Sequence, residues 1–439
     1  MDPDVPARRV FLECTSTHAS HYNTGIQRAV RNLVNASLAI APCTAVVYNG
    51  RHFEAIDALP YQAPIGPDRK GRLAVDLLRG AFQRTRSGVI RGIPARSVRN
   101  ALFSQRLEYG LRSVVYAAQN ARRWAGSYGR NASPIDFQHG DVLVLLDSTW
   151  NVDLTRELKR ANEAGADIWV VVNDLIPIQY PDFAPEGSPI LLDRWLRRTV
   201  PYAHGLLGIS HTVAEALRDH LERSGIAREG LRIEYFHLGA GIETDSDDEA
   251  IEDAVKSVFD AASGPVYLSV GTVEPRKQHA LVLDAFERLW RLATDAKLVF
   301  FGRHGWRSDD LARRVRTHPE FGRRLIWIEA GSDAALDYAY RHASAMIFAS
   351  RCEGFGLPLA EAMKYGLPVI ASDIPVFREI GGDYPRYFDV YSADALLEAV
   401  RDFEHERAVG SVKRRPRPWL SWPDSARMLL RTVAGGVAG

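Results

Sequence analysis

The chain alternates between short apolar runs and longer stretches in which apolar residues recur every three or four positions. The runs have the length and composition of buried strands, and the periodic stretches those of amphipathic helices. Strand-like runs occur at residues 9–14, 44–48, 141–146, 168–172, 205–209, 231–236, 266–270, 297–302, 325–328, 345–349 and 368–371. From Ile26 onward, Val30 and Val34 lie on one helical face. Strands that alternate with helices are typical of parallel α/β domains.

An acidic stretch divides this pattern into two parts. The segment from Glu243 to Asp253 contains seven acidic residues and few large apolar ones, which is the composition of an exposed linker. A chain of 439 residues is also long for a single domain. We therefore predict two domains, residues 1–242 and 264–415, joined by a linker at 243–263 and followed by a last helical segment at 416–439.

One segment of the first half is strongly basic. Between residues 69 and 130, fourteen Lys and Arg residues accompany only Asp76 and Glu108, a net charge of +12 in a chain whose total is +1. Leu, Val, Phe and Trp side chains are interleaved with these charges. Such a segment favours contact with anionic lipid. Nucleic acid is a competing partner, but no nucleic-acid-binding motif accompanies the charge, so we expect none. A helical insertion with a solvated basic face is the third interpretation.

Cysteine content and hydropathy bear on the compartment. The three cysteines show no spacing typical of metal ligands, which indicates a reducing environment. A polar stretch follows Met1, so we expect no signal peptide. No apolar run reaches the roughly 18 residues of a membrane span. We expect a cytoplasmic protein, bound peripherally to the inner face of the cytoplasmic membrane through residues 69–130.

The segment Ser350–Ser372 carries the most informative pattern. An apolar run is followed by Gly354 and Gly356, then by a proline and a helix-forming sequence. This order points free backbone N–H groups and the positive end of a helix at one place, where an anion such as phosphate binds. Glu353 and Glu361 flank that place. Because carboxylates beside a phosphate need another partner, and sugar hydroxyls suit them, we predict a nucleotide-sugar site.

The string EGFGLPLAEA, from Glu353 to Ala362, resembles the signature of the family-four retaining glycosyltransferases of the GT-B fold. The resemblance implies two Rossmann-like domains that face each other across a cleft, with a C-terminal helix that crosses back to the first domain. It also implies that residues 264–415 bind the nucleotide sugar and that residues 1–242 form the acceptor side. A role as a nucleotide-sugar epimerase would need proton-transfer residues, and the paired glutamates argue against it.

The donor contacts that the resemblance implies lie on several loops. Two adjacent cations after a strand, Arg276 and Lys277, can reach phosphates, and in the family they neutralise the donor diphosphate. Glu353 is expected to hold the sugar hydroxyls and Glu361 the ribose. The expected donor-binding residues are Gly271, Arg276, Lys277, Arg303, Glu353, Gly354, Phe355, Gly356, Leu357 and Glu361. The expected catalytic residues are Glu353, Arg276, Lys277 and Asp174.

In the first half, polar residues follow three of the predicted strands. The segment NTGIQRAVRNL resembles the start of bacterial polysaccharide glycosyltransferases, where this loop lies between donor and acceptor. Asn173 and Asp174 occupy the place where relatives carry His-Asp, but without the histidine no histidine base is carried over. For Arg28, contact with a phosphate and simple solvation are both open, and Asp147 and Asp174 have loop capping as an alternative role. The expected acceptor or phosphate loop residues are Thr24, Gly25, Asp147 and Asn173.

These motifs predict a retaining glycosyltransferase that uses a nucleotide-sugar donor and a glycan or lipid-linked glycan acceptor. GTVEPRK and GRHGW resemble mannosyltransferase segments and favour GDP-mannose in polysaccharide synthesis such as that of the lipopolysaccharide O-antigen. Rhamnose, fucose and glucose donors stay open. No Asp-x-Asp motif or histidine cluster follows a predicted strand, so we expect no metal and no cofactor. A non-catalytic nucleotide-sugar or membrane-binding module is the alternative from a different class.

Overall fold

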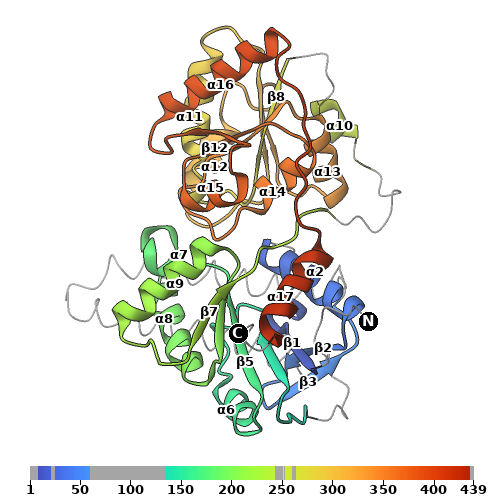
Figure 1. Ribbon diagram of the computed structural model, residues 1–439. Coiled ribbons are helices and arrows are strands. Elements are labelled where there is room, and N and C mark those ends of the chain that lie inside the picture. The colour runs from blue at the N-terminus through green and yellow to red at the C-terminus, as the bar shows by residue number, and fades with distance from the viewer. Residues whose placement is uncertain are drawn as a thin grey trace, which may run out of the picture.

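The computed structural model describes residues 8–20, 25–59, 134–242, 251, 253–259 and 264–435. These residues form two α/β domains, which lie one above the other in Figure 1. The basic segment 69–130, Thr24 and most of the predicted linker lie outside the described residues.

The described part of the first domain contains a seven-stranded sheet. In spatial order its strands are β3 (Phe53–Ile56), β2 (Cys43–Tyr48), β1 (Val10–Glu13), β4 (Val142–Leu145), β5 (Asp167–Val172), β6 (Gly205–Gly208) and β7 (Arg232–Tyr235). Neighbouring strands are parallel except β3, which pairs with β2 in the antiparallel direction. The apolar pattern did not predict β3, because this four-residue edge strand buries only Phe53 and Glu54.

Helices connect the parallel strands of the first domain. They are α1 (Thr15–His18), α2 (Gly25–Ile40), α6 (Thr155–Glu163), α7 (Ile176–Gln179), α8 (Ser188–Thr199) and α9 (His211–Ser224), with the 3-10 helices η1 (Pro181–Phe183) and η2 (Val200–Tyr202). Helix α2 buries Val30, Leu33 and Val34, as its periodicity predicted.

In the described residues, the second domain contains a six-stranded parallel sheet. Its spatial order is β10 (Leu325–Ile328), β9 (Lys297–Phe301), β8 (Val266–Val270), β11 (Ala345–Phe348), β12 (Val369–Ser372) and β13 (Arg386–Phe388). The helices around it are α10 (Asp253–Phe259), η4 (Pro275–Lys277), α11 (His279–Trp290), α12 (Asp309–Arg316), α13 (Asp333–His342), α14 (Leu357–Lys364), α15 (Pro375–Gly381) and α16 (Ala393–Ala408). The three-residue strand β13 was not predicted, because it is too short to give an apolar run.

The last helix, α17 (Trp422–Ala434), belongs to the first domain in space although it ends the chain. In Figure 1 it lies beside α2, and the two helices pack against each other. The segment before this helix is hydrogen-bonded to the end of the first domain. Ala240 N donates to Leu420 O over 2.9 Å, and Trp419 Nε1 donates to Leu238 O over 2.9 Å. This finding confirms the predicted C-terminal helix that crosses back to the first domain.

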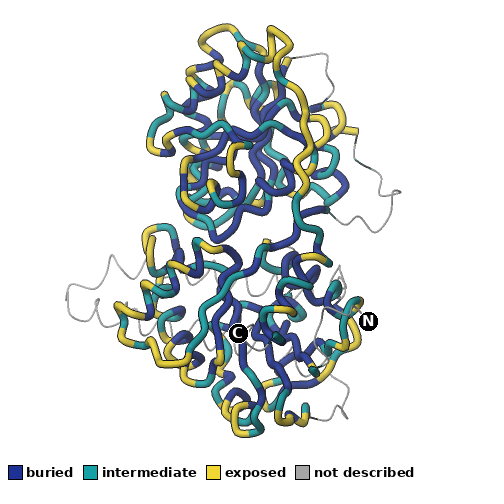
Figure 2. Tube along the Cα trace, in the orientation of Figure 1, coloured by how far each residue is buried: buried dark blue, intermediate teal, exposed yellow. Residues whose placement is uncertain are grey.

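The apolar core is continuous between the two domains. One cluster of buried side chains includes the first domain and one face of the second sheet, and a separate cluster packs the other face of that sheet against α11 and α16. Strand β8 shows the alternation, since Leu268 belongs to the first cluster and Tyr267 to the second. Figure 2 shows the buried residues along the middle of both domains.

Candidate active site between the two domains

The candidate site forms where loops at the carboxyl ends of strands from both sheets meet. In parallel α/β domains ligands bind at this edge, because the loops that follow the strands open there. The second domain contributes the loop after β8, which ends in η4, and the loop after β11, residues 349–356. The first domain contributes Asn173 and Asp174, which follow β5.

Glu353 is the centre of a buried ion cluster. Its carboxylate lies 2.5 Å from Arg276 Nη1 and 2.5 Å from Lys277 Nζ, and Ser350 Oγ donates to it over 2.7 Å. Arg276 also pairs with Glu274 over 2.7 Å. Burial alone would raise the pKa of Glu353, but the two cations outweigh it and hold that pKa at about 2. Glu353 is therefore a carboxylate at neutral pH.

The cations of this cluster differ in their response to burial. Burial favours loss of the proton from Arg276, but Glu353 and Glu274 reverse that effect and raise its pKa. Burial lowers the pKa of Lys277, and Glu353 only partly opposes it. The Lys277 ammonium group also lies 5.0 Å from the centre of the Phe348 ring. Arg276 thus keeps its charge at any relevant pH, whereas Lys277 is the titratable member.

Asp174 reaches the same cluster from the first domain. Burial raises its pKa, and Arg276 opposes that rise across the domain boundary. Its Oδ1 accepts a hydrogen bond from Ile176 N over 3.0 Å. Gly354 packs directly on this segment, since a Cβ atom there would lie 2.0 Å from Asn173 O. Only glycine allows this close approach of the two domains.

Two helices begin next to each other at this place. Helix α14 starts at Leu357 after Gly356, whose φ of 103° is a left-handed conformation that suits glycine. Helix α2 starts at Gly25, where a Cβ atom would lie 4.0 Å from Leu357 Cδ1. Because helix N-termini favour negative charge, their meeting favours an anionic ligand. The Phe355 side chain packs between His237 and Trp419, with ring centres 6.1 and 5.9 Å away.

Glu361 is buried on α14 and already has partners. Tyr340 Oη donates to its Oε2 over 2.8 Å, and Arg28 of α2 forms an ion pair with its Oε1. The Arg28 side chain is only 11% exposed. The interpretation of Arg28 as a solvated arginine is therefore wrong.

The remaining predicted site residues lie around this centre. Gly271 is beside Lys277, since a Cβ atom there would lie 3.3 Å from Lys277 Cε. Arg303 is exposed, and its carbonyl accepts from Val273 N over 2.8 Å. Asn173 Nδ2 donates to Ser148 Oγ over 3.2 Å.

Asp147 is buried and its carboxylate is used within the first domain. The backbone N–H groups of Thr17 and Ser148 donate to it. The buried Glu13 lies nearby, and burial, reinforced by Asp147, raises the pKa of Glu13 to about 8. Burial also raises the pKa of Asp147. This pair fixes the loops that precede α2, which agrees with the loop-capping role that the sequence left open.

Three residues of this region were missed at the sequence level. Glu274 pairs with Arg276, and Ser350 donates to Glu353. Each stands within three residues of its partner in the sequence, and that proximity could have identified both. Glu379 on α15 accepts from the backbone N–H groups of His211 and Thr212 over 2.7 and 2.8 Å. Glu379 Oε1 also lies 2.7 Å from His237 Nε2, and this contact joins the two domains. Nothing in the sequence near Glu379 indicates these distant partners.

Among the described residues, no group of three or more His, Cys, Asp and Glu side chains is arranged to hold a metal ion. The helices within the described ranges include none that is both long and apolar enough to span a bilayer.

Residues 251–417 match the family described as Glycosyl transferases group 1. The serotype-specific mannosyltransferase WbdA of Escherichia coli is 33% identical over 382 residues, which cover 82% of this chain and 46% of WbdA. Sucrose-phosphate synthase of Thermosynechococcus elongatus gives a TM-score of 0.54 at 16% identity, covering 97% of this chain and 94% of that chain. HepE of Anabaena in complex with UDP-glucose gives 0.52 at 12% identity, covering 97% and 95%.

The paired sheets, the crossing helix and the likeness to these two structures show the GT-B fold. The chain carries a domain of the Glycosyl transferases group 1 family, which confirms the resemblance found in the sequence. It spans about half the length of the curated relatives it matches, 46% in the case of WbdA.

Proposed function

We propose that this chain transfers mannose from GDP-mannose to a hydroxyl group of a glycan acceptor, with retention at the anomeric carbon. The observation that carries the proposal is the buried cluster of Glu353, Arg276 and Lys277 within a group 1 glycosyltransferase domain. The similarity to WbdA, a serotype-specific mannosyltransferase, supports mannose as the sugar, and we propose a bacterial polysaccharide as the product.

The cluster contains the groups that the reaction needs. Arg276 offers a planar fork of donors and Lys277 a compact charge, and both suit a diphosphate leaving group. Glu353 pairs with both cations, and Glu274 pairs with Arg276 as well. A bound diphosphate takes over the pairing of Glu353 with the cations, and Glu353 is then available to accept hydrogen bonds from the sugar hydroxyls. Preorganised cations at the leaving group lower the barrier to its departure.

Asp174 is suited to orient the acceptor hydroxyl. It enters the cluster from the first domain and lies against the glycine turn before α14, since a Cβ atom at Gly354 would lie 3.1 Å from Asp174 Cβ. Its raised pKa makes it a stronger hydrogen-bond acceptor for a hydroxyl group than an ordinary aspartate. Glu361 and the backbone from Gly354 to Leu357 complete the donor side, with Gly271 and Arg303 at the neighbouring loops.

We further propose that the reaction needs no metal ion, because Arg276 and Lys277 supply the positive charge that a divalent cation would otherwise bring. The residues that contact the acceptor or a phosphate are Thr24, Gly25, Asp147 and Asn173.

The proposal includes contact with a membrane. Through its basic segment 69–130, with a net charge of +12, the chain binds peripherally to the anionic inner face of the cytoplasmic membrane, where lipid-linked glycans are available.

A donor screen tests this function. GDP-mannose, GDP-fucose, GDP-rhamnose and UDP-glucose are each incubated with the chain and an α-linked mannose oligosaccharide, with and without EDTA. We expect release of GDP and an elongated product with GDP-mannose alone, unchanged by EDTA, and an α-linkage by NMR. Tight binding of GDP-mannose without turnover would indicate a non-catalytic module. Loss of activity in EDTA would contradict metal independence.

A further inference from the structure

We propose that Tyr180, Phe183, Arg351 and Tyr391 form a platform that binds sugar units of the acceptor glycan beside the candidate active site. The inference rests on the proposed function and adds to it the place where the acceptor chain lies. The four residues come from both domains, and we refer to them as the aromatic platform.

The platform is built around one guanidinium group. The Arg351 guanidinium carbon lies 5.7 Å from the centre of the Phe183 ring and 4.6 Å from that of Tyr391, so an arginine of the second domain stands near rings of both domains. Tyr180 stacks on Phe183 with ring centres 6.4 Å apart. Arg351 thus links the aromatic side chains into one surface.

The two tyrosines of the platform are exposed although the protein has large apolar cores to bury them, and Phe183 is half-buried. Tyr391 is 72% exposed and Tyr180 is 42% exposed. Exposed apolar groups that gather beside polar ones often mark a ligand surface. A pyranose ring has an apolar face of C–H groups and a rim of hydroxyls. It therefore fits flat aromatic rings that alternate with hydrogen-bond donors.

Arg351 connects this surface directly to the ion cluster. Its backbone N–H group donates to Arg276 O over 2.9 Å, and it stands two residues before Glu353. Its Nε atom is buried and has no hydrogen-bond partner among the described residues. Because buried donors are nearly always paired in native proteins, this atom points to a missing acceptor such as a sugar hydroxyl.

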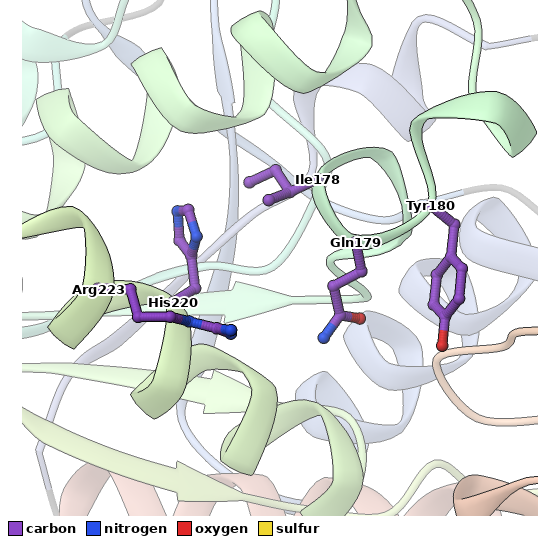
Figure 3. Close-up of a pocket in the computed structure, with 5 residues that line it drawn as sticks. All are labelled: Ile178, Gln179, Tyr180, His220 and Arg223. Carbon is purple, nitrogen blue, oxygen red and sulfur yellow. The ribbon is translucent and has the colours of Figure 1, made fainter.

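A pocket continues the platform into the first domain. It has a volume of about 500 Å³, and Tyr180 forms part of its wall (Figure 3). The other lining residues are Ile178, Gln179, His220 and Arg223. In Figure 3 Gln179 and Arg223 extend toward the same space between α7 and α9. The first domain is the acceptor side under the proposed function, so an oligosaccharide acceptor is the occupant that fits.

The test uses α-linked mannotetraose as the acceptor probe. We expect Tyr391→Ala and Tyr180→Ala each to raise its KM at least about fivefold, with the dissociation constant of GDP unchanged. Tyr391→Phe keeps the ring and should change the acceptor KM less than about twofold. Phe321→Ala is the matched control, because Phe321 is also 42% exposed but takes no part in the platform. An unchanged acceptor KM in both alanine variants would overturn the platform. Weaker GDP binding in the two alanine variants would also overturn the proposal, because the platform would then contact the base of the nucleotide donor.

Direct binding separates this proposal from the proposed function. Mannotetraose binding is measured by NMR on the wild-type chain and on Tyr391→Ala, without any donor. Binding that the substitution weakens supports the platform even if the donor screen finds no transfer. If the wild-type chain binds no oligosaccharide yet transfers mannose to a simple acceptor, the platform is overturned and the proposed function stands.

Discussion

Arg28 on α2 of the first domain and Glu361 on α14 of the second domain form an ion pair that joins the two domains. Both side chains are largely buried, with exposed fractions of 11% and 1%. Removing one partner of a buried pair leaves the other charge without compensation, whereas removing both costs much less.

This pair gives the first prediction. Arg28→Met should lower the free energy of unfolding by about 3 kcal/mol, because Glu361 keeps only Tyr340 as a partner. The double variant Arg28→Met with Glu361→Gln should recover part of that loss. Denaturant unfolding of the wild-type chain, Arg28→Met, Glu361→Gln and the double variant checks the expectation. The exposed pair Arg197–Asp193 is the control, and Arg197→Met should cost less than about 1 kcal/mol. Simple additivity of the Arg28 and Glu361 changes would refute a coupled pair.

The second prediction separates catalysis from nucleotide binding. Glu353→Gln keeps the shape of the side chain but removes its charge, so the hydrogen bonds to sugar hydroxyls weaken by roughly 1.5–3 kcal/mol. Turnover of GDP-mannose should fall at least about tenfold. GDP should bind at least as tightly as before, because Arg276 and Lys277 lose their internal anion. Kinetics and calorimetry measure the two effects, and wild-type turnover in this variant would remove Glu353 from the mechanism.

The third prediction concerns alkaline pH. Burial lowers the pKa of Lys277, so its positive charge is lost below the ordinary value of 10.5. The affinity for GDP should therefore fall as the pH rises toward that value, since a neutral amine attracts a diphosphate less. Lys277→Arg keeps its charge and should show a shallower decline. Calorimetric titrations at several pH values compare the two proteins, and equal slopes would mean that Lys277 does not hold the diphosphate.

The fourth prediction concerns the stability of the first domain. Burial and Asp147 raise the pKa of Glu13 from 4.5 to about 8 in the folded protein. The folded state therefore holds a proton that the unfolded state releases, and this contribution to stability is present below pH 4.5 and lost as the pH rises through about 8. Glu13→Gln should flatten the decline in unfolding free energy across that range. Glu163→Gln, on the exposed part of α6, is the control. Parallel pH profiles for wild type and Glu13→Gln would contradict the assignment.

The fifth prediction tests the membrane contact. The chain should sediment with vesicles that contain phosphatidylglycerol, bind neutral vesicles weakly and be released by salt, because screening weakens the attraction. Replacing six arginines of the basic segment by glutamine should abolish this sedimentation. The six are Arg79, Arg84, Arg86, Arg91, Arg96 and Arg99. Glutamine at the exposed Arg313 and Arg323 of the second domain should not abolish sedimentation. Equal binding to charged and neutral vesicles would leave the basic segment as a solvated surface.

Local patterns predicted much of this architecture, and contacts between distant segments account for most of what was missed. Glu353, Arg276 and Lys277 were named as site residues because each stands in a distinctive motif that follows a strand, but their mutual ion pairing was not predicted. The partner of Arg28 was not, since helical periodicity gives the face of a residue but not what lies opposite. The short strands β3 and β13 lack the length that an apolar run needs, and they are defined by their neighbours in the sheet.

The return of α17 to the first domain has a consequence for the order in which the protein is made. Helix α2 packs against α17, a helix that is translated only after the whole second domain. While the ribosome synthesises the second domain, α2 therefore lacks this native partner. The first domain, although its sheet is translated early, therefore cannot complete its folding before the second domain has been made, and until then its incompletely packed apolar surface is open to aggregation.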